Sequence, residues 1–331
     1  MIELFYLFIL IVTVGFSSSL FLTKVWIKIA SKAKLLGKDM NKYSKPLVPE
    51  AGGIAFVIGY TFSILIYIFL KTFYLSSISN IVEIFAVLVT ILLAGFLGFV
   101  DDILGWKKGL KQWQKPLLTI PIAIPLVVIN AGNSTITLPF FGSLDMGILY
   151  SLILVPIGVI GASNGFNMLA GYNGLEASMG IIILATLGIF AFSQNILWLT
   201  TIIFSAVFSL LGFLFYNKYP SKVFPGDSLT YSVGALIASI AILGNMESVA
   251  LFLFLPYFIE LLIKAKNKFK TECFGIPQKN GSLKPPRKIG SLTHIILKFF
   301  GSELKVYFSL ILIEMFISLA IIISYLFILH I

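Results

Sequence analysis

The chain has 331 residues, of which 58% are hydrophobic and only 11% charged, and its mean hydropathy is +1.01. A soluble domain carries roughly 25% charged residues, so this composition excludes a water-soluble globular protein and predicts a polytopic protein in the lipid bilayer. The net charge is +10. We nevertheless expect no nucleic-acid partner, because Lys and Arg in cytosolic loops are what orients membrane helices.

Apolar runs predict an all-α polytopic membrane protein with about ten transmembrane helices, built as one membrane-embedded domain over residues 1–331. In chain order, we expect these helices near 2–22, 51–70, 83–100, 117–131, 146–161, 177–193, 196–216, 228–244, 248–263 and 306–329. The first run lacks a basic start and a small-residue cleavage site, so it predicts a retained span rather than a signal peptide.

Basic residues divide the predicted loops into two sides. One side holds 23 of the 24 Lys and Arg residues, and the other keeps only Lys71. This asymmetry predicts that the basic loops are cytosolic and that both termini lie outside. The basic loops are 24–50, 101–116, 217–227 and 264–305. We interpret the longest, 264–305, as a cytosolic substrate-binding loop, and its Cys273 as an ordinary free thiol.

The polar residues that could support chemistry gather in four segments on this basic side. They are Glu50, Gly52 and Gly53 before the second span, Asp101 and Asp102 after the third, Asn164, Asn167, Asn173 and Glu176 after the fifth, and Asp227 before the eighth. Each segment alone has an ordinary interpretation, since an Asp pair or an Asn-rich loop is usually a solvated turn. Their joint placement at one membrane face favours a site assembled from separate elements.

The chemistry of this site is expected to involve a divalent cation and phosphate. Asp and Asn oxygens are hard ligands that suit Mg²⁺, with Mn²⁺ as an alternative, whereas two histidines and one cysteine argue against zinc. A cation would offset the clustered carboxylates and bridge phosphate oxygens. Further phosphate charge could be held by four nearby lysines, Lys107, Lys108, Lys111 and Lys115.

Two more features fit a nucleotide donor, each with a plain alternative. Gly52 and Gly53 expose backbone before a helix, where N–H groups can meet an anion, but a turn or helix-packing role is equally consistent. Phe224 could offer a stacking face for a nucleobase. Glu260 and Glu314 lie within apolar runs. We expect Glu260 to reach the interface, and assign Glu314 no role.

Two other classes of protein compete with a transferase. A transporter or channel would place charged residues near the bilayer midplane and could show internal repeats. The acids of this chain are expected mainly at helix ends, and no repeat stands out. A structural scaffold would give no reason for the Asn, Asp and Lys constellation.

Three strings in the chain resemble the polyprenyl-phosphate N-acetylhexosamine-1-phosphate transferases, in particular the UDP-GlcNAc–dolichyl-phosphate branch. They are LDMGILY at 144–150, NGFNMLAGYNGLEA at 164–177 and PSKVFPGD at 220–227. The resemblance runs from about residue 46 to about residue 280. It implies transfer of GlcNAc-1-phosphate from UDP-GlcNAc to dolichyl or another polyprenyl phosphate, with release of UMP. The same chemistry with another UDP-HexNAc, or for cell-wall polymer synthesis, is the alternative.

The resemblance also implies roles for particular residues. The family's aspartate pair falls on Asp101 and Asp102, and its phosphate-binding lysine falls on Lys111. Its magnesium ligands fall on Asn167 and Asp227, and its uracil contacts on Phe224 and Asn173. Its acidic residue before span two falls on Glu50. A phosphomonoester has its second pKa near ~6, so the acceptor is largely dianionic at pH 7. The aspartate pair is therefore expected to orient groups rather than to remove a proton, although a covalent aspartyl intermediate stays open.

The last basic loop departs from the family pattern. The histidine-rich motif of the bacterial peptidoglycan enzymes is reduced to His294, which disfavours the peptidoglycan substrate. The Arg/His cluster of the dolichol enzymes is also missing, and Lys279, Lys284 and Arg287 are the candidate replacements. The implied location is the cell membrane, or the endoplasmic reticulum membrane in a eukaryote, with a cytosolic active site. A homodimer is an open alternative.

Overall fold

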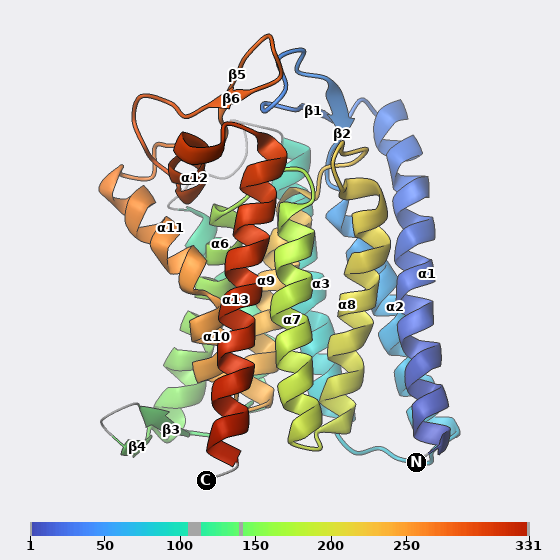
Figure 1. Cartoon of the computed structure of the whole chain (residues 1–331). Helices are drawn as coiled ribbons and strands as arrows, with labels where there is room; N and C mark the ends of the chain where they lie inside the picture. The colour runs from blue at the N-terminus through green and yellow to red at the C-terminus, as the bar shows by residue number, and fades with distance from the viewer. Residues whose placement is uncertain (1, 105–113, 139–141, 330–331) are drawn as a thin grey trace.

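The computed structural model describes residues 2–104, 114–138 and 142–329, which form a bundle of long helices (Figure 1). The first helices along the chain are α1 (Ile2–Lys32), α2 (Gly53–Phe73), α3 (Ile81–Leu104), α4 (Gln114–Leu118) and α5 (Ile120–Val128). A π-helical turn, Tyr150–Leu154, leads into α6 (Val155–Met168), which is followed by α7 (Leu175–Ser193), α8 (Leu197–Asn217) and α9 (Gly226–Leu243). The last are α10 (Glu247–Leu253), α11 (Leu255–Lys266), α12 (Leu292–Phe300) and α13 (Glu303–Leu329).

The structure confirms a polytopic membrane protein, while the expected count of ten spans is not reached by length and composition alone. Among the described residues, eight helices are long and apolar enough to cross a membrane, and the bent pair α10–α11 makes a ninth. The span expected at 117–131 corresponds to α4 and α5, which together cover only Gln114–Val128.

Prolines explain why these two spans are irregular. Proline lacks the N–H that an α-helix needs, so it shortens or bends the helix that contains it. Helix α5 has Pro121 in its first turn and Pro125 inside it. Pro256 lies at the start of α11, where the pair α10–α11 bends by 58°.

Three small antiparallel ribbons correct the all-α expectation. They pair β1 (Leu36–Lys38) with β2 (Leu47–Pro49), β3 (Thr135–Leu138) with β4 (Gly142–Asp145), and β5 (Ile276–Pro277) with β6 (Leu283–Lys284). In the first ribbon, Leu36 lies opposite Pro49. Strands this short cannot show the alternation of apolar and polar residues by which a strand is recognised in a sequence.

Helix α9 forms the core of the bundle and packs against α2, α3, α6 and α7. Within its most apolar stretch, 83% of the residues are buried. Glycines allow the close approach, as is common between membrane helices. A Cβ atom added to Gly98 of α3 would lie 2.3 Å from the Asp227 carbonyl oxygen, and one added to Gly53 of α2 would lie 2.2 Å from the Leu229 nitrogen.

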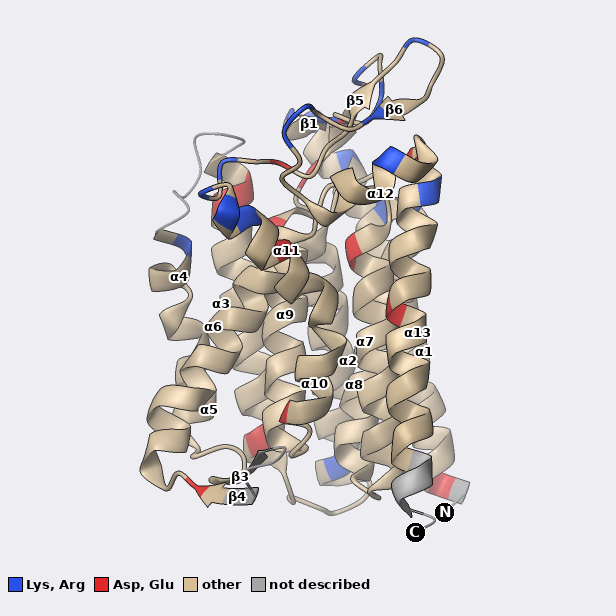
Figure 2. Ribbon diagram, turned by 60° about the vertical axis from the view of Figure 1, so that its left-hand side comes forward, with Lys and Arg blue, Asp and Glu red and all other residues tan. Residues whose placement is uncertain are grey.

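The two ends of the bundle differ in charge. Figure 2 shows Lys and Arg gathered at one end, while both ends of the described chain lie at the other. The ribbons β1–β2 and β5–β6 and the helix α12 lie at the basic end (Figure 1). The described parts of the loops that the sequence assigned to one side therefore share one end of the molecule.

Candidate active site

A cavity of about 520 Å³ lies at the basic end of the bundle. Its walls come from the β1 segment, the Asn-rich loop between α6 and α7, and the loop that enters α9, with Phe274 added from the last basic loop. Residues that the sequence singled out line it together: Glu50, Asn167, Asn173, Glu176, Phe224 and Asp227. Segments from Lys34 to Phe274, far apart in the sequence, thus meet at one site, as their placement on one face predicted.

Lys115 lies between two of the expected acids. Its Nζ atom is 2.9 Å from Asp101 Oδ2 and 2.6 Å from Asp227 Oδ2. Its ammonium also lies 5.7 Å from the centre of the Tyr231 ring. Lys115 is one of the four lysines that the sequence analysis named for holding phosphate charge. Lys107, Lys108 and Lys111 lie outside the described residues.

Asp102 anchors the start of α9. Its carboxylate accepts hydrogen bonds from the backbone N–H groups of Asp227, at 2.7 Å, and Ser228, at 3.2 Å. These N–H groups belong to the first turn of a helix, which carries partial positive charge. Gly226 permits the approach, because its φ is +70° and a Cβ there would lie 2.3 Å from Asp102 Oδ2. Asp102 therefore positions Asp227 rather than facing an open site.

The donor set fits a Mg²⁺ ion that is completed by substrate. Among the described residues, the carboxylates of Asp101 and Asp227 share the ammonium of Lys115, which leaves an excess of negative charge. Asp227 and Asn167 line the same cavity and offer hard oxygens. Mg²⁺ is commonly held by one or two carboxylates together with substrate phosphates and water. The described residues contain no group of three or more His, Cys, Asp and Glu able to hold a metal.

Glu50 lies at the edge of the same cavity, just before α2. Burial, and secondarily the charge of Asp227, raises the pKa of the Glu50 carboxyl above its usual range. The Trp26 indole N–H donates to the Glu50 carbonyl at 2.8 Å. Gly37 leaves room for the carboxylate, since a Cβ there would lie 1.9 Å from Glu50 Oε1.

Gly52 and Gly53 differ from the expectation that their N–H groups meet an anion. The Gly52 N–H donates to the Phe224 carbonyl and the Gly53 N–H to the Pro225 carbonyl, both at 2.8 Å. The N–H groups are therefore already paired, and the lack of side chains serves close packing of α2 against the loop that carries Phe224. That loop is also held by the Phe224 N–H, which donates to the Pro49 carbonyl at 2.8 Å.

Several other residues named from the sequence do not line the cavity. The Asn164 amide donates to Thr119 Oγ1 and to the Ile160 carbonyl, both at 2.9 Å, and so joins α6 to the start of α5. Lys279, Lys284 and Arg287 are exposed around the β5–β6 ribbon. Glu314 is fully buried, and neither carboxyl oxygen has a partner among the described residues.

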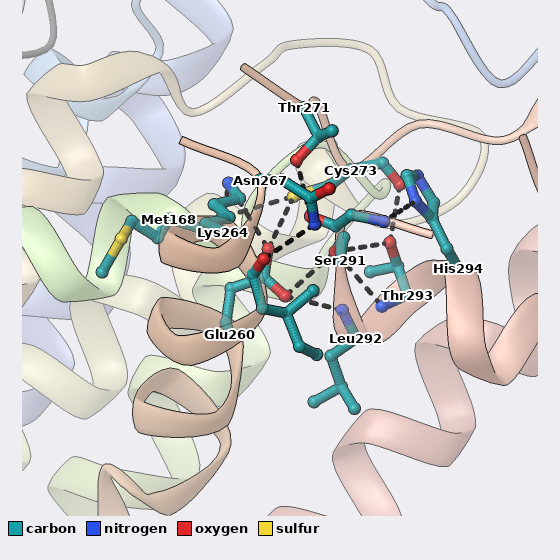
Figure 3. Close-up of polar contacts among 12 residues, drawn as sticks. Met168, Glu260, Lys264, Asn267, Thr271, Cys273, Ser291, Leu292, Thr293 and His294 are labelled. Atoms are coloured by element: carbon teal, nitrogen blue, oxygen red, sulfur yellow. Dashed lines mark hydrogen bonds and ion pairs between the residues drawn. The ribbon is translucent and has the colours of Figure 1, made fainter. Parts of the chain in front are cut away.

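The sequence did not reveal a buried polar cluster that attaches the last basic loop to α11 (Figure 3). We call it the Glu260 anchor, formed by Glu260, Lys264, Cys273, Ser291 and Leu292. Glu260 does not reach the interface as expected, because it is fully buried. Its carboxylate accepts from Leu292 N at 2.7 Å, from Ser291 Oγ at 3.0 Å and from Cys273 Sγ at 3.5 Å, and lies 3.4 Å from Lys264 Nζ.

Cys273 is a free thiol, as the sequence predicted, and the anchor holds it in the interior. Cys273 is buried, its thiol also donates to the Met168 carbonyl at 3.2 Å, and burial raises its pKa. Beside it, His294 accepts from the Gly290 N–H through Nδ1 and pairs with the Phe274 carbonyl through Nε2. The loop is thus folded against the bundle, and it brings Phe274 to the cavity wall.

A second, apolar cavity of about 460 Å³ lies between α6, α9 and the bent pair α10–α11. Small residues of α6 line it, among them Gly158, Gly161 and Gly165. Consecutive residues of α6 line the two cavities, Asn167 the polar one and Met168 the apolar one. A phosphate group would find matching surroundings in the polar cavity and a long hydrocarbon chain in the apolar one.

Comparison with known proteins agrees with this geometry. The family model described as glycosyl transferase family 4 matches residues 84–245. A protein of Sulfolobus acidocaldarius, provisionally named UDP-N-acetylglucosamine–dolichyl-phosphate N-acetylglucosaminephosphotransferase, is 40% identical over 88% of this chain and 87% of its own length. A protein of Saccharolobus solfataricus with the same provisional name is 38% identical, over 84% of each chain.

A bacterial relative is more distant. The phospho-N-acetylmuramoyl-pentapeptide-transferase of Prochlorococcus marinus is 33% identical over 72% of this chain and 69% of its own length. The range matched by the family model contains Asp101, Asp102, Asn167 and Asp227. This chain belongs to glycosyl transferase family 4.

Proposed function

We propose that this chain transfers GlcNAc-1-phosphate from UDP-GlcNAc to dolichyl or another polyprenyl phosphate, releasing UMP and leaving polyprenyl-diphospho-GlcNAc in the membrane. The main support is that consecutive residues of α6 line a polar and an apolar cavity, Asn167 the first and Met168 the second. A lipid phosphate needs both surroundings at once, since its isoprenoid tail stays in lipid while its headgroup meets a nucleotide. The names of the two archaeal relatives state this substrate pair.

In the proposed reaction, an oxygen of the lipid phosphate attacks the donor phosphorus that bears the sugar, and the bond from that phosphorus to UMP breaks. The acceptor needs no strong base, because the second pKa of a phosphomonoester is about 6. Mg²⁺ held by Asp227 and Asn167 would supply positive charge to the pyrophosphate oxygens. Lys115 adds a further cation beside Asp227, and Asp102 keeps the start of α9 in place.

We further propose ten crossings, with the active site cytosolic and both termini outside. Both ends of the described chain lie at the same end of the bundle, which requires an even number of crossings. Nine full spans would leave them on opposite sides, so α4 and α5 would together supply the tenth. The basic end is the one expected to face the cytosol, in the cell membrane or, in a eukaryote, the endoplasmic reticulum membrane.

The identity of the sugar is tested by competition between donors. UDP-GlcNAc should give the highest kcat/KM, because the relatives from Sulfolobus acidocaldarius and Saccharolobus solfataricus carry that donor in their provisional names. Another UDP-HexNAc is the nearest alternative, since none of Lys279, Lys284 and Arg287 lines the cavity. A preference for UDP-MurNAc-pentapeptide would instead align the chain with its bacterial relative and contradict the proposal.

The metal is tested with Asp227→Ala. We expect the rate to fall by roughly three orders of magnitude or more, because metal stabilisation of phosphoryl charge contributes several kcal/mol. Mg²⁺ should raise the unfolding temperature of the wild type but not of this variant. Asp145→Ala removes an exposed carboxylate at the opposite end and is the matched control. Full turnover in EDTA would end the metal assignment.

A further inference from the structure

The amide of Asn173 has a defined orientation in the polar cavity. Asn173 is only 5% exposed, and its Nδ2 donates to Asp39 Oδ2 at 3.2 Å. A carboxylate only accepts hydrogen bonds, so the NH₂ side of the amide must face Asp39. The carbonyl side, Oδ1, then points away from Asp39. Asn173 Oδ1 has no partner among the described residues. It is also absent from the fully buried polar atoms that lack a partner, so it stays accessible from the cavity that Asn173 lines.

Asp39 is itself fixed by the turn between β1 and β2. Its second oxygen, Oδ1, accepts from the Asn41 backbone N–H at 3.1 Å, and its own N–H donates to the Pro46 carbonyl at 3.0 Å. Asn41 is tied to the opposite walls, because its Nδ2 donates to the Gly171 carbonyl at 2.9 Å and its Oδ1 accepts from Gly275 N at 3.0 Å. Both oxygens of Asp39 are therefore committed.

The backbone beside the amide is held as well. Asn173 N donates to Glu303 Oε1 at 3.3 Å, and the other oxygen of Glu303 pairs with the Lys42 ammonium. Asp39 of the first basic loop thus holds the side chain of Asn173, and Glu303 at the start of α13 holds its backbone. This network fixes the Asn173 amide in one orientation and leaves its Oδ1 atom as the acceptor that faces the cavity.

We propose that Asp39 is a positioning residue that makes the site select uracil over cytosine. By binding the NH₂ of Asn173, Asp39 presents Asn173 Oδ1 to the base as a hydrogen-bond acceptor. Uracil carries a donor at N3–H, whereas cytosine has an acceptor at N3 and would meet this oxygen with repulsion. Phe224, on the opposite loop of the same cavity, offers a ring for the base. The inference rests on the proposed function, because it assumes a UDP-sugar donor.

The variant Asp39→Asn should reverse the orientation of the Asn173 amide rather than leave that amide free to rotate. The Asn41 N–H requires an acceptor, so the new amide would turn its oxygen toward Asn41 and its NH₂ toward Asn173. Asn173 would then rotate its own oxygen toward position 39 and present NH₂ to the base. This donor matches N3 of cytosine. In the double variant Asp39→Asn with Asn173→Asp, the NH₂ group at position 39 donates to one carboxylate oxygen at position 173. The other carboxylate oxygen then faces the base as an acceptor, as Asn173 Oδ1 does in the wild type.

The test is the ratio of the dissociation constants of UMP and CMP, measured by calorimetry on the purified full chain with Mg²⁺. The wild type should prefer UMP by on the order of 10- to 100-fold, the effect of one well-placed hydrogen bond against an unsatisfied one. Asp39→Asn should move the preference toward CMP, and the double variant should restore it to UMP. Asp145→Asn, the same change at the opposite end, should keep the wild-type ratio.

If Asp39→Asn does not fold, Asp39→Ala replaces it, and the preference should fall toward one because the amide of Asn173 becomes free to rotate. Suppose that the wild type prefers UMP. If Asp39→Asn or Asp39→Ala keeps this preference, or if the double variant does not restore it, the role of Asp39 is overturned while the proposed function stands. A wild type that binds neither nucleotide, or both equally, would overturn the proposed function and this role with it.

Discussion

At the residue scale, the acids around Lys115 show which parts of the site could be predicted from the sequence. The motifs predicted that Asp101, Asp102 and Asp227 belong together, and the structure brings Asp101 and Asp227 onto one ammonium. The spacing did not predict that Lys115, in the short helix α4, provides this ammonium. The sequence also did not predict that the two neighbouring aspartates have different contacts. Only the fold shows that Asp102 accepts hydrogen bonds from the first turn of α9.

Lys115→Met should lower kcat by on the order of 100-fold, since it removes a cation beside the phosphoryl group. It should also destabilise the apo protein by about 3 kcal/mol, because two poorly solvated carboxylates lose their counter-ion. Mg²⁺ should therefore raise the unfolding temperature of this variant more than that of the wild type. An equal rise in both proteins would contradict the arrangement of Lys115 between the two acids.

At the element scale, the position of α9 depends on glycines that the sequence did not single out. Gly98→Ala would press a methyl group against the Asp227 carbonyl and shift the start of α9. A misplacement of about 1 Å near a reacting group can lower the rate by about 10²-fold, and we expect a loss of that order in kcat. Gly95→Ala, one turn earlier on α3, meets the Val57 side chain instead and is the control. Equal rates for the two variants would show that this contact is not critical.

The last basic loop was predicted as a polar region with a free cysteine, and its attachment to the bundle could not be anticipated. A buried acid such as Glu260 has no signature in sequence that distinguishes it from one that reaches the interface. Glu260→Ala should leave Leu292 N, Ser291 and Lys264 without their acceptor and cost about 2–4 kcal/mol of stability. Limited proteolysis should then cut first within 267–290, whereas cleavage unchanged from wild type would refute the anchor.

His294 should give the loop a pH dependence. Burial lowers its pKa below the usual 6.5, and its two contacts suit the neutral ring, with Nδ1 accepting from Gly290 N–H. A depressed pKa means that the stabilising contribution is present above pH 6.5 and is lost as pH falls below it. The unfolding temperature of the wild type should therefore decline relative to that of His294→Gln between about pH 6.5 and 5. A difference that does not vary with pH would exclude a neutral buried His294.

At the scale of the whole molecule, hydropathy and charge predicted most of the architecture, because membrane helices must satisfy their own backbone and show it as long apolar runs. The prolines that shorten α5 and bend α10–α11 fall where the apolar runs continue, so the boundaries there were less visible. The two-residue strands β5 and β6 depend on tertiary contacts and leave no local pattern.

The predicted orientation is tested by cysteines at Ser44, on the basic end, and at Thr135, on the opposite end, both of which are exposed. In intact cells an impermeant thiol reagent should label Thr135→Cys and spare Ser44→Cys. Cys273 is buried with a raised pKa, so the parent chain should give little background. Labelling at Ser44 alone would invert the topology and move the active site outside.

The central claim is that a phosphosugar, and not a sugar alone, is moved to a lipid phosphate. Its most direct measurement uses the purified chain with dolichyl phosphate and UDP-GlcNAc that is labelled in the phosphate next to the sugar. We predict that the label enters the lipid fraction, that UMP is released in equal amount, and that the lipid product contains two phosphates. Release of UDP, with the label left in the aqueous nucleotide, would contradict the proposed reaction.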